Sequence, residues 1–246
     1  NPLNSLFSSI HETGHGLYQQ GLPREHLGTA PGEAIGMAVH ESQSRLWENQ
    51  VGRSRSFWEF WEPRYREVFP KQLSSIDSEE FYFAINTVSL NPIRTNSDEV
   101  TYNLHIILRF EIEKRLFQGS LSTADLPYAW NELSSKIVGL RPLHDSQGAL
   151  QDIHWAGGSF GYFPSYCLGN ILAAQLWFSA NEQLPDLDND FRRGEFQPFL
   201  KWLNRNIHSL GKTQDTLQII EKVTGCELSP SFLIRYLTER YLPLYS

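Results

Sequence analysis

The feature that most constrains this chain is a pair of histidines four residues apart near its start, His11 and His15. Residues four apart lie on one face of an α-helix, about one turn apart, so both imidazoles can reach one metal ion if the segment is helical. Glu12 completes a His-Glu-x-x-His pattern and could act as general base on a water that the metal activates. The same sequence pattern would also arise from two surface histidines and a solvated glutamate that bind no metal. The pattern therefore demands a helix here and a third ligand further along the chain.

Helical periodicity continues through most of the chain, and no convincing segment alternates like a strand. Ile10 and Leu17 share an apolar face that places both histidines mid-helix. Asp77 is a candidate helix cap, and Asn96 with Glu99 has capping-box spacing. Without an internal repeat or a clear linker, the sequence predicts a mainly α protein with one domain over residues 1–246. We expect helices at about residues 5–21, 33–62, 78–88, 100–116, 128–139, 171–180, 196–210, 213–224 and 230–241.

Two glycines interrupt the first predicted helix at Gly14 and Gly16. Each costs about 1 kcal/mol of helix stability relative to alanine. Residues this small would suit the helix if a second backbone packs close to it. We therefore expect a close neighbour at this point.

Composition excludes several classes of protein. The net charge of −7, with no cluster of lysine and arginine, argues against a nucleic-acid surface. The longest uncharged segment, residues 155–181, contains four glycines and a proline, so we do not expect it to cross a membrane. No basic leader precedes the first helix, so we expect no signal peptide. Cys167 and Cys226 form neither a disulfide framework nor a thiolate metal site, which favours a reducing, cytoplasmic location.

The helix expected over residues 33–62 offers several candidates for the third ligand. Glu33, Glu41 and Glu48 are spaced so that all three could share one broad face. His40 is a further candidate. Periodicity does not choose between these residues.

Five short motifs, taken in order, carry a resemblance to a known family. The His-Glu-x-x-His helix is followed by His-Glu-Ser-Gln-Ser-Arg at residues 40–45. Residues 93–98 read Ile-Arg-Thr-Asn-Ser-Asp, close to Ile-Arg-x-x-Ala-Asp with Ser97 in place of the alanine. Residues 148–155 fit Gly-x-x-Gln-Asp-x-His-Trp, and residues 161–166 read Gly-Tyr-Phe-Pro-Ser-Tyr. Together these motifs resemble the carboxypeptidase Taq family of metallocarboxypeptidases.

The resemblance implies an all-helical, zincin-like (neurolysin-like) metallopeptidase that removes C-terminal residues from peptides with broad side-chain preference. It implies Glu41 as the third ligand beside His11 and His15. Two imidazoles and a carboxylate suit one divalent ion of borderline softness, so we expect zinc, with cobalt able to occupy the same site. Glu12 would take the proton of the attacking water and pass it to the leaving amine.

A carboxypeptidase must also recognise a free carboxylate, and Arg94 is the candidate for this task. Its planar guanidinium offers a two-pronged donor that matches a carboxylate. The alternative is a structural salt bridge to Asp98 or Glu99. Spacing alone does not decide between the two roles.

The later motifs offer groups that could stabilise developing negative charge. His154, Tyr162 and Tyr166 can donate hydrogen bonds toward such charge, although each tyrosine could equally be a core residue with a satisfied hydroxyl. Gln151 and Asp152 could orient these groups or bind substrate backbone. Asp152 could instead hold a metal-ligating histidine in its tautomer.

Members of this family are considerably longer than 246 residues, and their metal helix lies near the middle of the chain. We therefore expect this chain to be the C-terminal catalytic half, without the upstream wall of the substrate groove. Apolar surface that would meet the missing N-terminal half favours self-association. The expected partners are peptide substrates, a second copy in a homodimer, and the missing half.

Two other functions compete with this interpretation. Another His-Glu-x-x-His peptidase, an aminopeptidase or an endopeptidase, would share the metal core and differ in how it recognises the substrate ends. An inactive helical module with a binding or assembly role would need no metal. Metal analysis together with hydrolysis of N-blocked and C-amidated peptides separates the three.

Overall fold

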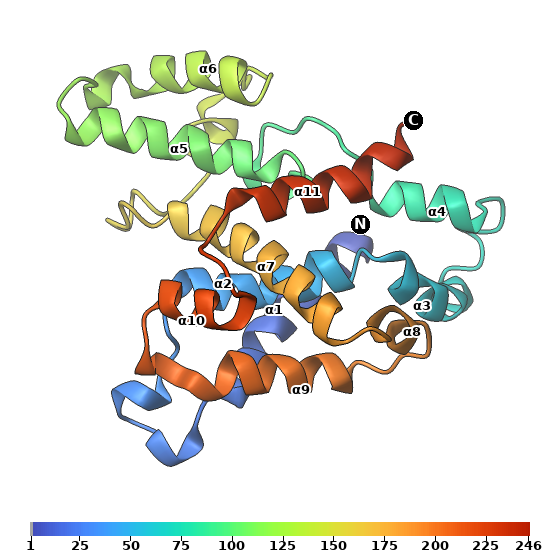
Figure 1. The fold of residues 1–246 in the computed structure, drawn as a ribbon. Coiled ribbons are helices and arrows are strands. Elements are labelled where there is room, and N and C mark those ends of the chain that lie inside the picture. Colours follow the sequence, from blue (N-terminus) through green and yellow to red (C-terminus); the bar gives the residue numbers. More distant parts are fainter. Residues whose placement is uncertain (1) are drawn as a thin grey trace. The chain divides into compact units, whose positions relative to one another are not determined.

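The computed structural model describes residues 2–246, which form helices, turns and loops without a strand among them (Figure 1). The predicted mainly α fold is confirmed. Two compact units make up the described chain. The first combines the segment ending at Asn86 with residues 168–246, and the second is residues 87–167. The single catalytic domain over residues 1–246 stays a prediction.

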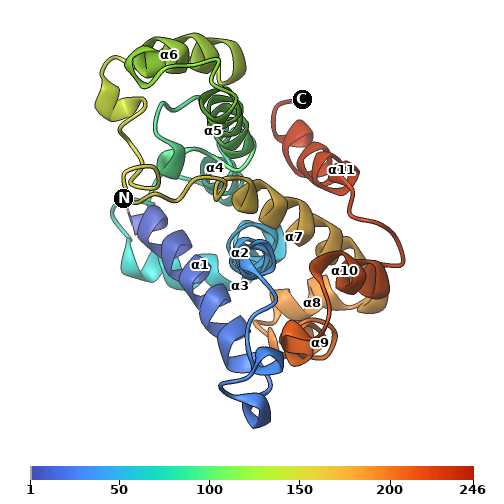
Figure 2. The same ribbon diagram turned by 90° about the vertical axis from the view of Figure 1, so that its left-hand side faces the viewer.

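The first unit contains most of the helices, and two of them, α1 and α2, pack directly against each other (Figure 2). A large apolar core joins them to the helices that follow, with Tyr18, Leu46, Leu176 and Phe199 wholly buried. The helices are α1 (Pro2–Gly21), α2 (Met37–Arg45), a π-helical continuation (Leu46–Val51), α3 (Arg55–Val68), α4 (Ser78–Ile85), α7 (Pro164–Gln183, from Leu168 on), α8 (Leu187–Arg192), α9 (Gln197–Asn206), α10 (Thr216–Thr224) and α11 (Pro230–Tyr241).

Close packing of α1 on α2 explains one of the two glycines. A Cβ added to Gly14 would stand 2.6 Å from the Cα of Ser44 and 2.7 Å from the carbonyl oxygen of Gln43. Only glycine allows the backbones to approach this closely. The expectation is confirmed for Gly14 and is wrong for Gly16, where a Cβ would meet nothing within 4 Å.

The helix predicted over residues 33–62 is in fact two helices. It begins at Met37 rather than at residue 33, and it ends in the π-helical turns before Gly52. A new helix, α3, starts after Ser54, whose hydroxyl accepts from the backbone N–H of Phe57 at 3.2 Å. The serine cap fixes this second start, which apolar periodicity alone does not reveal.

Other predicted boundaries also differ from the structure, and the helix expected at residues 171–180 spans Pro164–Gln183. Helix α3 continues through Pro63 to Val68. Proline has no N–H to donate to the carbonyl of Glu59, four residues earlier. The helix tolerates this loss because Glu59 and Pro63 are both exposed, so water can solvate the carbonyl. The Asn96 capping box is wrong. Asn96 belongs to a 3₁₀ turn, and Asp98 instead accepts from the two backbone N–H groups just before α5.

The second unit is built on a helical hairpin of α5 (Tyr102–Phe117) and α6 (Leu126–Ile137), which run antiparallel (Figure 1). Its core is a cluster that includes Leu108, Ile112 and Trp130. Loops and short 3₁₀ turns fill residues 138–163, and the first turn of α7 completes the unit. These loops carry the motif at residues 148–155 and the start of the one at 161–166, and the motif at 93–98 lies in the segment before α5.

None of the described helices has the combination of length and apolar character that crossing a bilayer requires. The segment at residues 155–181 divides into a glycine-rich loop and most of α7.

Candidate active site

Three potential metal ligands gather in the first unit. His11 and His15 project from α1, and Glu41 projects from α2. Glu41 Oε2 lies 3.6 Å from His11 Nε2 and 3.5 Å from His15 Nε2, and one donor atom from each residue falls within 4.8 Å of the others. The close approach of α1 and α2 at Gly14 is what brings the three together.

This arrangement fits a divalent metal ion. Bonds of about 2.0–2.1 Å in a tetrahedral site place neighbouring ligand atoms about 3.4 Å apart. The two distances from Glu41 Oε2 match that value. The histidines keep 18% and 22% of their side-chain surface exposed, whereas Glu41 keeps 5%. The donor set is therefore closed on the Glu41 side and reachable on the histidine side.

Glu41 is held as a carboxylate with one oxygen turned toward the histidines. Arg45 Nε donates to Oε1 at 2.8 Å, so the other oxygen, Oε2, faces the imidazoles. Burial by itself raises the pKa of Glu41, but the hydrogen bond with His15 and the charges of Arg45 and His11 outweigh it and hold the pKa at about 2. Gly169 of α7 packs on this side chain, and a Cβ there would stand 2.7 Å from Glu41 Cγ.

The other faces of the two imidazoles are also occupied. His11 Nδ1 lies 2.9 Å from Glu48 Oε2, and His15 Nδ1 lies 2.6 Å from His40 Nδ1. Burial raises the pKa of Glu48, but Arg45, the hydrogen bond with His11, and Arg53 bring it below its usual value. Burial and the neighbouring His15 lower the pKa of His40.

The candidates for the third ligand therefore separate in space. Glu41 meets the Nε2 side of both histidines, Glu48 meets the Nδ1 side of His11, and Glu33 is an exposed residue in the turn before α2. Glu12 is exposed on α1 beside His11 and outside the three-residue group. Its role as base stays a prediction.

A second polar cluster lies within the second unit and is centred on Asp152. Arg94 Nη2 donates to Asp152 Oδ1 at 2.7 Å, and Arg109 Nε donates to Oδ2 at 2.7 Å. Two guanidinium groups thus share one carboxylate, which leaves an excess of one positive charge. Arg109 is wholly buried. Arg94 therefore does form a salt bridge, and its partner in that bridge is Asp152.

The electrostatics of this cluster follow from burial and from the shared carboxylate. Burial raises the pKa of Asp152, but its bonds with Arg94 and Arg109 outweigh this effect and lower it. Burial is also the main reason why the pKa of Arg109 falls to about 10, with Asp152 opposing the change. For Arg94, burial is outweighed by the effects of Tyr102 and Asp152, and its pKa is raised.

Gln151 anchors the backbone on which Arg94 sits. Its Oε1 accepts from the backbone N–H of Arg94 at 2.8 Å, and its Nε2 donates to the carbonyl oxygens of Pro92 and Gln147. The Arg94 side chain is held in turn by Tyr102, whose hydroxyl accepts from Nη1 at 2.8 Å. Gln151 therefore ties two loops together around the arginine.

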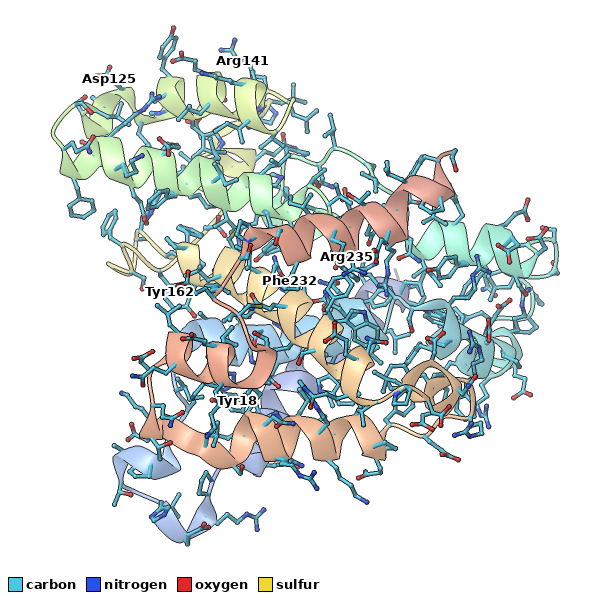
Figure 3. The ribbon with its side chains drawn as sticks, viewed as in Figure 1. Tyr18, Asp125, Arg141, Tyr162, Phe232 and Arg235 are labelled. Carbon is cyan, nitrogen blue, oxygen red and sulfur yellow. The ribbon has the colours of Figure 1, made fainter. Side chains whose placement is uncertain are left out.

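The aromatic candidates lie together beside this cluster, within the same unit. His154 Nε2 and Tyr166 OH are 3.0 Å apart, and the Tyr162 ring centroid lies 5.5 Å from that of His154 and 5.4 Å from that of Tyr166. Figure 3 shows Tyr162 in the loop just before α7. Burial is the largest cause of the lowered pKa of His154.

Sequence reasoning missed a buried polar stripe on α5. His105, Arg109 and Glu113 follow one another at intervals of four residues on an otherwise apolar face, and all three are buried. Glu113 accepts from Trp155 Nε1 at 2.7 Å and from the backbone N–H of Gly161 at 3.1 Å, which anchors the glycine-rich loop. Polar residues repeating at this spacing inside an apolar stripe were the available signal.

An all-helical chain with two histidines on one helix and a glutamate on the next, set for one metal ion, has the site of a helical metallopeptidase. The sequence model for the carboxypeptidase Taq (M32) metallopeptidases matches residues 1–241. This chain belongs to that family.

Individual relatives agree with this assignment. The chain is 50% identical to thermostable carboxypeptidase 1 of Thermus thermophilus over 240 residues, which cover 98% of this chain and 47% of that protein. It is 44% identical to carboxypeptidase 1 of Bacillus subtilis over 241 residues, covering 98% and 48%. The crystal structure of the M32 carboxypeptidase from Deinococcus radiodurans superposes with a TM-score of 0.96 at 44% identity, covering all of this chain and 50% of that one. The chain thus spans about half the length of these relatives.

Proposed function

We propose that this chain is the catalytic half of a metallocarboxypeptidase that hydrolyses the C-terminal peptide bond of peptides with broad side-chain preference. The observation that carries the proposal is the convergence of His11, His15 and Glu41 on one point, in a chain of the M32 family. These three residues would hold one divalent ion. Zinc suits two imidazoles and a carboxylate, and cobalt can replace it.

When bound, such an ion lowers the pKa of a coordinated water toward about 7 and polarises a carbonyl group. Glu12 acts as the general base. It takes a proton from the water as the water oxygen adds to the scissile carbonyl carbon, and it returns the proton to the amine nitrogen as the carbon–nitrogen bond breaks. The exposure of Glu12 leaves its carboxylate accessible for this exchange.

Substrate recognition falls to the second unit. The excess positive charge of Arg94 and Arg109 over Asp152 suits the free carboxylate of a peptide. Arg94 makes that contact, while Asp152 and Gln151 fix its side chain and backbone.

Three ring residues complete the set of proposed contacts with the substrate. His154, Tyr162 and Tyr166 form one cluster, and each can donate a hydrogen bond toward negative charge on the substrate. The hydrogen bond between His154 and Tyr166 fixes the position of each side chain relative to the other.

The test is hydrolysis of an N-blocked dipeptide and of its C-amidated form by the zinc-loaded chain. A carboxypeptidase cleaves the first and not the second, since the amide removes the charge that Arg94 recognises. Glu12→Gln should keep its zinc and lower kcat by about 10²–10⁴-fold, and the exposed Glu67→Gln on α3 serves as the control. Equal cleavage of the two peptides would overturn the carboxypeptidase assignment, and an unchanged kcat in Glu12→Gln would overturn the assignment of the base.

We also propose that full-rate hydrolysis needs the additional chain that the relatives carry outside the match. The first unit supports this with an apolar groove of about 560 Å³ along α1, α3 and α9, lined by side chains that include Ile10, Leu17, Phe57, Trp61 and Leu200. We assign this groove to the remaining half of the family's chain. The 246-residue chain alone should hydrolyse a blocked dipeptide much more slowly than a full-length relative does, and equal rates would refute the requirement.

A homodimer and a cytoplasmic location complete the proposal. Both cysteines, Cys167 and Cys226, are free thiols, which suits a reducing compartment. Sedimentation of the purified chain tests the homodimer, because a monomer at micromolar concentration would contradict it.

A further inference from the structure

Each histidine that faces Glu41 with Nε2 is also engaged at its second ring nitrogen. Glu48 lies behind His11, and His40 lies behind His15. Neutral imidazole carries one proton, which sits on either Nδ1 or Nε2, and a nitrogen that carries it has no lone pair for a metal. The residue behind each ring therefore decides whether its Nε2 can serve as a ligand.

For His11 the direction of the bond follows from charge. Glu48 is paired with Arg45, whose Nη1 donates to Oε2 at 3.1 Å, and Arg53 Nη2 lies 4.0 Å from Oε1. A carboxylate between two guanidinium groups is ionised at neutral pH and can only accept hydrogen bonds. The Nδ1 of His11 must therefore be the donor across the 2.9 Å contact. Its Nε2 then presents a lone pair toward the point that Glu41 Oε2 faces, 3.6 Å away.

For His15 the partner is a second imidazole. The two Nδ1 atoms are 2.6 Å apart, so one of them donates and the other accepts. If His15 accepts, its proton sits on Nε2 and the ring cannot bind a metal. If His15 donates, its Nε2 is free, and His40 must be neutral with its own proton on Nε2. Only the second arrangement is compatible with the group formed by His11, His15 and Glu41.

We propose that Glu48 and His40 are positioning residues that hold His11 and His15 in the tautomer with a free Nε2. This inference rests on the proposed metal site. It assigns different chemistry to the two rings, because a charged carboxylate backs His11 and a neutral imidazole backs His15. Arg45 contacts both a proposed metal ligand and a proposed positioning residue, because it donates to Glu41 with Nε and to Glu48 with Nη1.

The first experiment reads the tautomers in the metal-free chain by ¹⁵N NMR of the imidazole groups near pH 7. Wild type should carry a proton on Nδ1 of both His11 and His15, in addition to any proton that Nε2 shares with the Glu41 carboxylate in the absence of metal. Glu48→Met removes the acceptor and should remove the proton from Nδ1 of His11 while His15 stays unchanged. His40→Leu should do the reverse. The exposed residues Glu67 and His26 supply matched controls, Glu67→Met and His26→Leu, which should alter neither ring.

The second experiment measures the zinc dissociation constant by competition with a chelator. Loss of a group that orients a ligating histidine typically weakens metal affinity by about 10–100-fold, and we expect this range for Glu48→Met and His40→Leu. Glu48→Gln is the reserve if the methionine variant does not fold, because it preserves volume and a possible acceptor oxygen but removes the charge. It should raise the dissociation constant by about tenfold.

The outcomes separate this inference from the proposed function. A wild-type chain that binds no zinc overturns the metal site, and the tautomer measurement still stands as an independent result. A wild-type chain that binds zinc but lacks a proton on Nδ1 of metal-free His11 or His15 overturns the positioning roles alone. An unchanged dissociation constant in Glu48→Met, or in His40→Leu, overturns the role of that residue.

Discussion

The polar clusters of the two units are built in opposite ways. In the first unit, two helix-borne carboxylates, Glu41 and Glu48, face histidines and share one arginine, Arg45. In the second unit, two arginines share the single carboxylate of Asp152. The first set offers lone pairs to a cation, and the second offers excess positive charge to an anion. Under the proposed function, the first set would hold the metal ion and the second would bind the C-terminal carboxylate of a peptide.

The clusters also differ in how the chain assembles them. His11, His15 and Glu41 come from two helices in direct contact, and their spacing follows helix periodicity. Arg94 and Asp152 are 58 residues apart in the chain and meet through loops. The first cluster forms because two helix backbones pack closely, and the second forms because buried arginines pair with a buried carboxylate. Loss of a charged group should therefore affect the two clusters differently.

The sharpest test is to remove one charged group from each cluster and measure bound zinc. Glu41→Gln should lose zinc to background, because the neutral amide replaces the only carboxylate of the donor set. Arg94→Lys should keep its zinc and raise KM for a blocked dipeptide at least about tenfold, since hydrogen bonds to charged groups are each worth about 1.5–3 kcal/mol. Elemental analysis and steady-state kinetics supply the two readouts. Loss of zinc in Arg94→Lys would mean that the clusters do not have separate tasks.

Asp152→Asn should be the most damaging of these changes for stability. It leaves two buried guanidinium groups without their carboxylate, and breaking a buried pair costs about 3–5 kcal/mol. Asp188, whose side chain is 60% exposed in its pair with Arg192, gives the matched control. Asp188→Asn should cost at most about 1 kcal/mol. Urea unfolding measures the free energy of unfolding of both variants. Equal losses would show that the buried cluster contributes no more to stability than the exposed pair.

Acid should weaken the protein through its buried histidines, beginning with His208 in the first unit. Burial, aided by His40, lowers the pKa of His208 in the first unit from its ordinary 6.5 to about 3. Between those values the unfolded chain binds a proton that the folded chain does not, so the free energy of unfolding falls as pH falls, by about 1.4 kcal/mol per pH unit. In the second unit, burial likewise lowers the pKa of His105 from 6.5 to about 4, so the same loss begins there, and the lowered pKa of Asp152 adds to it only as pH falls below 3.8.

Denaturant titrations between pH 7 and pH 4 check this prediction. His208→Gln should flatten the loss of stability across that range, whereas the exposed His144→Gln should leave it unchanged. The same slope in His208→Gln and wild type would contradict a role for the buried histidine.

The glycines of α1 offer the smallest and most local test. Gly14→Ala would force a Cβ to within 2.6 Å of Ser44 Cα and should cost about 1–3 kcal/mol. Gly16→Ala meets open space and should stabilise the helix by up to about 1 kcal/mol. Thermal unfolding of the two variants checks the pair. Zinc affinity should fall in Gly14→Ala alone, because only that change separates α1 from α2.

Much of the fold could be predicted from the sequence because the signals that indicate a helix lie within short segments of the chain. The apolar stripe of α1 and the helix cap at Asp77 are properties of short segments, and the structure keeps both. The predicted boundaries were wrong where local signals competed. Ser54 starts a new helix inside an apolar stretch, and Pro63 is tolerated because its surroundings are exposed.

For the site, the residue types and the common face of His11 and His15 can be read from the sequence, because their spacing follows from 3.6 residues per turn. The face expected for three glutamates was wrong for Glu33, which lies before α2. Tertiary structure alone decided which glutamate meets Nε2, which one backs a ring through Nδ1, and that Arg109 joins Arg94 on Asp152. The physical reason is that periodicity fixes directions around one helix, whereas these contacts depend on how close a second backbone comes. At α1 and α2 that distance is set by the missing side chain of Gly14.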